Sequence, residues 1–202
     1  MSTDSITETT ALTAALLADG WTYTHPVRTE PQRRTRIHEL ASGDGRLNLD
    51  AAEFPDGHMT AQLSVEAVRI GPGRRPGWMA ELHAVPLPVA LAAITAASGN
   101  GSNPCVQDVL TAYGWTQRED ITERDRVLER AWDSPDGTRT VSHLPGDRFE
   151  SGYWLVGRPG PDGRHAETQI SLQTPAAVIT ALALTDDPDQ TGPSPAPAPE
   201  TN

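Results

Sequence analysis

The sequence predicts an α+β protein: a tandem duplication of a helix–four-stranded antiparallel meander–helix unit, followed by a disordered C-terminal tail. Three observations predict it. An apolar helical stretch ends in Gly-Trp-Thr in both halves, three turns follow in the same order, and each half closes with a proline-led apolar helix. The predicted divisions are a flexible N-terminus over 1–10, a first α+β repeat over 11–97, a linker over 98–103, a second α+β repeat over 104–184, and an acidic Pro/Ala tail over 185–202.

The first helix of each repeat is predicted to stop at a glycine. Gly20-Trp21-Thr22 recurs in the second half as Gly114-Trp115-Thr116. Glycine adopts the left-handed conformation at a helix end without a Cβ clash. For the helix starts, Ser5 and Glu8 have the spacing of a capping box, and Asn103-Pro104 predicts a cap followed by proline at the first helical position.

Three turns are predicted to join four strands in each repeat. They fall at Asp44-Gly45, Pro55-Asp56-Gly57 and 71–77 in the first, and at Pro135-Asp136-Gly137, Pro145-Gly146-Asp147 and 157–163 in the second. Asp-Gly is a strong hairpin signal because both turn positions favour positive φ. Apolar and polar side chains alternate in three of the intervening segments, 63–67, 78–84 and 166–173. This pattern predicts antiparallel strands that are covered on one face only.

Each predicted meander leads into a helix that follows a proline. Pro86-Leu87-Pro88 precedes a helix over 89–97, and Thr174-Pro175 precedes a helix over 176–184. The remaining chain after Thr185 has almost nothing apolar to bury and is predicted to be disordered. Its aspartates at 186, 187 and 189 are expected to fold back onto the arginine-rich part of the first repeat.

Composition narrows the class of protein. All 16 basic residues are arginine, which together with abundant Ala, Pro and Asp indicates a high-GC, actinobacterial genome. The net charge is −11, but more than half of it lies in 1–10 and 185–202, so the folded part is only mildly acidic. No apolar run is long enough to cross a membrane, and the N-terminus lacks the form of a signal peptide, so a cytoplasmic protein with no membrane partner is predicted.

No catalytic, cofactor or metal site is predicted. The chain has no Walker lysine, no G-x-S-x-G and no H-E-x-x-H, and its six histidines are not paired at ligand spacing. Cys105 is the single cysteine, which excludes an intramolecular disulfide. It is interpreted as a small residue at a helix start in preference to a reactive thiol. The five tryptophans are interpreted as core residues in preference to stacking platforms.

Arginines of the first repeat are the candidate contact residues. Segment 24–38 holds four arginines against one acid, and segment 69–77 holds three and no acid. They are Arg28, Arg33, Arg34, Arg36, Arg69, Arg74 and Arg75. The two segments form one positive region only if the first strand lies near the third turn. The alternative is that they are ordinary solvated strand edges, where charge prevents edge-to-edge pairing. In the second repeat the arginines are interleaved with acids and predict a self-compensated surface.

Turn and packing residues carry a resemblance that covers most of 11–184. In the second half they are Gly114-Trp115, Ser134-Pro135-Asp136-Gly137, Leu144-Pro145, Trp154 and Thr174-Pro175 ahead of Ala181-Leu182. In the first half they are Gly20-Trp21, Asp44-Gly45, Phe54-Pro55, Trp78, Ala80, Leu82 and Pro88. In these motifs the chain resembles two tandem copies of the actinobacterial domain-of-unknown-function family 317. The resemblance implies a fold and a source on an actinobacterial chromosome or mobile element, and implies no activity.

Two functional hypotheses follow. The first is a non-catalytic interaction module of such a chromosome or mobile element, with an unknown protein as its partner. The second is a single-stranded nucleic-acid binder that uses the arginine-rich first repeat, because four strands followed by a helix, duplicated, is also the topology of Whirly and Pur-alpha-type repeats. An enzyme ranks third, since no acid–base or nucleophile constellation is present.

Overall fold

The structure is a computed structural model that describes residues 11–55, 59–66, 68–70, 73–75, 77–82, 85–99, 104–147, 151–159 and 165–186. The first half contains α1 (Ala11–Ala18), β1 (Thr22–Tyr23), β2 (Arg28–Glu30), β3 (Thr35–Ala41), β4 (Asn48–Glu53), β5 (Met59–Val65), β6 (Val68–Ile70), β7 (Gly73–Arg75), β8 (Trp78–Glu81) and α2 (Leu87–Ser98). The second contains α3 (Val106–Ala112), β9 (Thr116–Gln117), β10 (Ile121–Glu123), β11 (Arg126–Asp133), β12 (Thr140–Gly146), β13 (Ser151–Pro159), β14 (His165–Ser171) and α4 (Ala176–Leu184).

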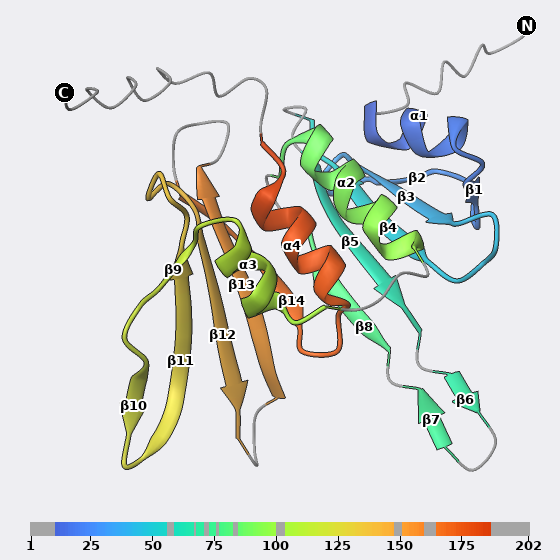
Figure 1. Cartoon of the computed structure of the whole chain (residues 1–202). Coiled ribbons are helices and arrows are strands. Elements are labelled where there is room, and N and C mark those ends of the chain that lie inside the picture. Colours follow the sequence, from blue (N-terminus) through green and yellow to red (C-terminus); the bar gives the residue numbers. More distant parts are fainter. Residues whose placement is uncertain are drawn as a thin grey trace, which may run out of the picture.

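Twelve of the strands form one antiparallel sheet. Its order is β1-β3-β4-β5-β8-β14-β13-β12-β11-β10, with β2 also pairing β3 and β9 also pairing β11. The β6–β7 hairpin is a separate two-stranded sheet that extends beyond the large one (Figure 1). The α+β class and the antiparallel strands are therefore confirmed, but the two separate four-stranded meanders are not, because the strands of both halves share one sheet.

The two halves join where β8 pairs with β14. Ile170 lies opposite Ala80 in this pairing, and both are fully buried. Side chains extend the seam: the Met79 N–H donates to Ser171 Oγ at 3.0 Å, and the Thr174 hydroxyl donates to the Met79 carbonyl at 3.3 Å. Above this seam α2 packs against α4, and α1 and α3 lie outside them on the same face of the sheet (Figure 1). A single hydrophobic core therefore runs through both halves.

Both predicted glycine stops are confirmed. Gly20 has φ +86 and Gly114 has φ +78, so each takes the left-handed conformation after its helix. The Trp21 N–H donates to the Leu16 carbonyl and the Gly20 N–H to the Leu17 carbonyl, which is the Schellman pattern. The same two bonds recur at the end of α3, and Trp21 and Trp115 are both buried in the core.

The first turn of each half is held by one shared set of hydrogen bonds. The Ser134 hydroxyl donates to Asp136, whose carboxylate also accepts the Thr138 N–H at 3.1 Å. Ser42 and Asp44 do the same in the β3–β4 turn, where Asp44 accepts the Arg46 N–H. The hydrogen bond from Ser42 lowers the pKa of Asp44 to about 2, and that from Ser134 lowers the pKa of Asp136. The Asp-Gly signal located both turns, while the hydrogen bonds of the serine two residues before each aspartate were not predicted.

Burial follows the predicted alternation. Ala61 and Leu63 on β5, Ala80 on β8, and Thr168 with Ile170 on β14 face the helices and are buried. Three tryptophans, 21, 115 and 132, are buried, and the other two pack partly against the core. The tryptophans are core residues, as interpreted from the sequence.

Several helix and strand boundaries differ from those predicted from the sequence. The closing helix over 176–184 is confirmed, and α2 is longer than predicted, running from Leu87 to Ser98. The prediction of proline at the first position of α3 is wrong, because the helix starts at Val106 with Cys105 as its N-cap. Pro145, Gly146 and 157–159 belong to strands β12 and β13 and not to turns, since a proline near a strand end loses no essential ladder bond.

Other predictions concern chain outside the described residues. The capping box at Ser5 and Glu8, the Asn103 cap, residues 56 and 57 of the second turn, residues 71, 72, 76 and 160–163, and the tail from 187 onward all lie there. The predicted turn over 71–77 is too long, because 73–75 form β7.

Glycine is required at the end of α1 because of its positive φ. We expect Gly20→Ala to lower the free energy of unfolding by about 1–2 kcal/mol, since an L-residue is strained in the left-handed region. Gly99→Ala is the matched control: this glycine also ends a helix, but its φ is −68, and alanine there is expected to be neutral. Urea denaturation measures both, and equal losses would contradict the assignment of strain to Gly20.

The seam between β8 and β14 makes the two halves one folding unit. Thr174→Val removes the hydroxyl that bonds the Met79 carbonyl and should cost about 1 kcal/mol. We expect hydrogen exchange to speed up together in β3–β5 and in β11–β13, because both belong to one sheet. Thr180→Val, which loses a bond within α4 only, is the control. Faster exchange in the second half alone would contradict a shared unit.

Candidate interaction surfaces

One face of the large sheet is not covered by any helix that the structure describes. All four helices lie on the opposite face (Figure 1). The strand residues that alternate with the core residues therefore point away from the helices, and they are mostly half-buried or exposed. We call this surface the open face. It extends over strands of both halves.

A row of aligned side chains crosses the open face. Glu39 lies opposite Asp50, Asp50 opposite Gln62, and Gln62 opposite Glu81. The antiparallel register of Ile170 with Ala80 then puts Gln169 opposite Glu81. The row continues through Leu155 to Ser142. It is acidic on β3, β4 and β8 and uncharged on β14, β13 and β12.

An apolar patch occupies the second half of the open face. It consists of Leu144 and Tyr153, which lie directly opposite each other on β12 and β13, and of Leu155. All three are half-buried. Met79 on β8 lies next to this patch, because its N–H bonds Ser171, the residue opposite Tyr153.

Asp50, at the acidic end of the row, has a raised pKa. Burial raises the pKa of Asp50, the charge of Glu39 raises it further, and the charge of Arg28 acts in the opposite direction. Glu39 itself is paired with the Arg28 guanidinium and lies 2.6 Å from His25 Nδ1. The two opposed carboxylates are a like-charged cross-strand pair, which is unfavourable in a sheet.

The structure separates the candidate arginines of segment 24–38. Arg28 pairs with Glu39, and Arg36 pairs with Glu53 at 2.8 Å. Arg33 and Arg34 are exposed between β2 and β3, and Arg34 has a φ of +53. The acid partners are on neighbouring strands, outside the window in which the sequence showed only Glu30.

The arginines of segment 69–77 lie elsewhere. Arg69 and Arg74 are opposite each other in the β6–β7 hairpin, and Arg75 follows. This hairpin leaves the sheet at the end where Val65 pairs with Trp78. Arg36 is at the other end, opposite Glu53, which in turn is opposite Met59. The condition for one continuous positive region, strand one beside the third turn, is not met.

Several described arginines of the second half are paired with acids, as predicted. Arg118 Nε donates to Asp133 at 2.6 Å, and Arg130 Nε lies 3.2 Å from Asp120. Of the tail aspartates only Asp186 is described, and it pairs at 3.1 Å with Arg139 of the second half. The expected contact of Asp186 with the first repeat is therefore wrong.

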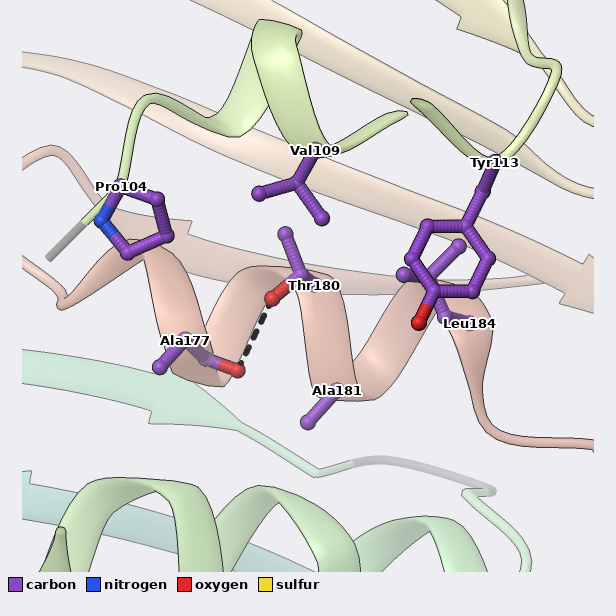
Figure 2. A pocket seen from close by; sticks show the side chains of 7 residues that line it. All are labelled: Pro104, Val109, Tyr113, Ala177, Thr180, Ala181 and Leu184. Atoms are coloured by element: carbon purple, nitrogen blue, oxygen red, sulfur yellow. Dashed lines mark hydrogen bonds between the residues drawn. The ribbon is translucent and has the colours of Figure 1, made fainter. Parts of the chain in front are cut away.

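An apolar groove lies between α3 and α4. Figure 2 shows Val109 and Tyr113 on one side and Thr180 and Leu184 on the other. Tyr113 is 64% exposed, and the Thr180 hydroxyl is bonded to the Ala177 carbonyl of its own helix. The lining has no acid, base or thiol, so the groove lacks the convergent polar groups of a catalytic site.

A buried polar cluster lies at the end of the first-half core. His38 is fully buried on β3, with its Nε2 at 3.5 Å from Glu53 Oε2 and its Nδ1 at 3.2 Å from the Tyr23 hydroxyl. Burial lowers the pKa of His38, although Glu53 opposes that effect. No pattern in the sequence indicated that this histidine is buried. Because the imidazole is enclosed, we interpret the cluster as structural and not as a reaction centre.

In the second half, the side chains at the corresponding strand positions are less buried. His143 stacks on Trp154 with ring centroids 4.4 Å apart, and burial together with Arg130 lowers the pKa of His143.

Cys105 is exposed at the start of α3. Among the residues that the structure describes, no three His, Cys, Asp or Glu side chains are grouped as metal ligands would be. The longest described helix, α2 with 12 residues, is too short to cross a membrane.

Comparisons with known proteins add no relative. A scan against protein-family models, a search of the curated proteins and a search of the solved structures each found no match. The resemblance to family 317 therefore stays a prediction.

The two histidines with lowered pKa values make stability depend on pH. As the pH falls, histidines of the unfolded chain become protonated near a pKa of about 6.5, whereas His38 and His143 of the folded chain become protonated only at lower pH. The free energy of unfolding should therefore fall as the pH drops from 7 to 5. His38→Gln combined with His143→Gln should flatten this dependence. His165→Gln, which alters an exposed histidine, is the control. Urea titrations at each pH measure it, and an unchanged slope in the double variant would contradict the assignment.

Proposed function

We propose that the protein is a non-catalytic, protein-binding module and that the open face is its binding surface. The observation that carries the proposal is the uncovered sheet surface, which spans both halves and combines an acidic row with an apolar patch. Antiparallel sheets commonly leave one face in water, but half-buried leucine and tyrosine side chains next to each other favour contact with another protein.

The charge distribution favours a protein partner over single-stranded nucleic acid. Nucleic-acid binding needs arginines that are available to phosphates. Two of the candidate arginines are paired with glutamates, and the two arginine segments lie at opposite ends of the strands. The open face itself carries Glu39, Asp50 and Glu81, which would repel a phosphate backbone.

We also propose that the halves are copies of one unit. The repeated Schellman stops, the repeated Ser-x-Asp-Gly turns and the matching order of elements support a tandem duplication. The halves have diverged on the open face, where the acidic row lies in the first and the leucine–tyrosine patch in the second. Membership of family 317 and a role on an actinobacterial chromosome or mobile element rest on the resemblance alone.

The test is affinity capture from nuclease-treated lysate of the source organism. The variant Tyr153→Thr with Leu155→Thr removes most of the apolar patch while keeping residues that suit strands. We expect it to lose the protein that wild type captures, with affinity reduced by about tenfold or more, because a partner contact there costs more than about 1 kcal/mol when truncated.

The control variant changes the same residue types elsewhere. Tyr113→Thr with Leu87→Thr replaces a tyrosine and a leucine that are 64% and 37% exposed at the end of α3 and the start of α2, which cover the other face of the sheet. It should capture the partner normally. Loss in the control variant instead would place binding at the α3–α4 groove or at the start of α2. Binding of labelled single-stranded oligonucleotides at low salt, lost on Arg33→Ala with Arg34→Ala, would favour the nucleic-acid hypothesis.

A further inference from the structure

We propose that the groove between α3 and α4 is a binding site for a proline-rich segment, and that residues 193–199 of the chain itself occupy it. This inference goes beyond the proposed function, because the groove lies on the helix side of the sheet and not on the open face (Figure 1). Two independent features carry it: the uncharged apolar lining of the groove, and the sequence and attachment point of the chain that follows α4.

The lining of the groove is apolar and has one available polar side chain. Val109 lies on the α3 side, and small side chains of α4 followed by Leu184 form the opposite side (Figure 2). The Thr180 hydroxyl already donates to the Ala177 carbonyl. The Tyr113 hydroxyl has no partner among the residues that the structure describes. The groove therefore suits an uncharged ligand that offers apolar rings and a carbonyl acceptor.

A proline-rich segment has this chemistry. A polyproline II helix makes no internal hydrogen bonds, so its carbonyls are free to accept, and its proline rings are apolar. Proteins bind such segments in grooves lined by aromatic side chains, where the preformed helix loses little entropy. Tyr113 is 64% exposed, so its ring is available to pack on a proline while its hydroxyl donates to a carbonyl. A charged segment would find no counter-charge in the lining.

The chain after α4 contains a matching segment. Residues 193–199 read Pro-Ser-Pro-Ala-Pro-Ala-Pro, with a proline at every second position and no charge. Proline-rich sequences favour the polyproline II conformation, and the serine and alanines between the prolines are small enough to allow close contact with a surface. Gly192 precedes the segment, and glycine allows the chain to reverse its direction there.

The end of α4 attaches this segment beside the groove. Leu184, the last residue of α4, is itself part of the lining. The two residues after it are held in place: Arg158 Nη2 donates to the Thr185 carbonyl at 3.3 Å, and Arg139 pairs with Asp186 at 3.1 Å. The segment therefore starts from a fixed point at one end of the groove.

The lengths of the tether and of the segment are sufficient. Seven Cα steps lead from Asp186 to Pro193 and reach roughly 23 Å when extended. Along α4 the groove runs from Leu184 back to Ala177, a rise of about 10 Å. In polyproline II the residues from Pro193 to Pro197 cover about 12 Å. The segment is thus able to reach the groove and to fill its length.

Attachment to the same chain favours occupancy. A short flexible tether gives the segment an effective concentration of about 1 mM at the groove. A site with a Kd of about 100 μM would then be roughly nine-tenths occupied. The groove is closed to a proline-rich segment of another protein unless that segment displaces the one in place.

The experiment uses the full chain and a labelled peptide with the sequence of residues 190–200. In wild type the chain's own segment competes with the peptide. Pro195→Ser with Pro197→Ser weakens that competitor, so we expect fluorescence anisotropy to show peptide binding about tenfold tighter than in wild type. A second peptide, with serine in place of every proline, should bind to neither protein.

A matched pair of variants locates the peptide. Added to the Pro195 and Pro197 substitutions, Tyr113→Thr removes the aromatic ring of the groove and should weaken peptide binding by about tenfold. Leu87→Thr removes a 37% exposed leucine at the start of α2, outside the groove, and should leave the binding unchanged. Circular dichroism checks that both variants are folded.

Three results would overturn the proposal. Equal peptide binding by wild type and by the Pro195 and Pro197 variant would show that the chain's own segment does not occupy the groove. Unchanged binding after Tyr113→Thr would place the peptide elsewhere. Dimers in sedimentation that are lost in the Pro195 and Pro197 variant would assign the groove to the segment of a second copy.

The proposed function is tested separately. Capture of a partner at the open face is measured with Tyr153→Thr and Leu155→Thr, neither of which lines the groove. Failure of the peptide experiment leaves that result unchanged, and failure of the capture experiment leaves the groove proposal unchanged.

Discussion

The antiparallel pairing of β8 with β14 determines most of what this molecule presents to its surroundings. These two strands are the last of their respective halves. They meet through Ile170 and Ala80, and the Met79 backbone donates to Ser171 and accepts from Thr174. Pairing at this position removes an open edge from each half. It also brings α2 against α4, so that one core is shared.

The same pairing produces a long surface. Separate sheets would each expose a small face, whereas one sheet aligns Glu39 of the first half with Leu155 of the second in a single row. The closing helices are held in matching ways on the other side: Arg46 donates to the Ser98 carbonyl at the end of α2, and Arg139 donates to the Ala183 carbonyl near the end of α4. These bonds hold the ends of α2 and α4 within the chain, and the open face is the surface that we propose for a partner.

The two halves differ most where packing does not dictate the residue. The helix stops and Ser-x-Asp-Gly turns are alike because a left-handed position and a buried tryptophan allow few alternatives. His38 and Arg130 each stand four residues before the serine of the following turn, but the histidine is buried and the arginine is exposed. Surface residues are free to differ, and the acidic row and the apolar patch show how far they do.

By itself the sequence determined the local elements: the Gly20 and Gly114 stops, the Asp-Gly turns, the closing helices and the alternating strands. Each depends on residues close together in the chain, through a positive φ, a proline at a helix start or a period of two. Only the tertiary structure decided that the halves share a sheet, that Glu39 and Glu53 pair with Arg28 and Arg36, and that Glu39, Asp50 and Glu81 align. These relations depend on strand order and register, which bring together residues far apart in the chain and leave no periodic trace in it.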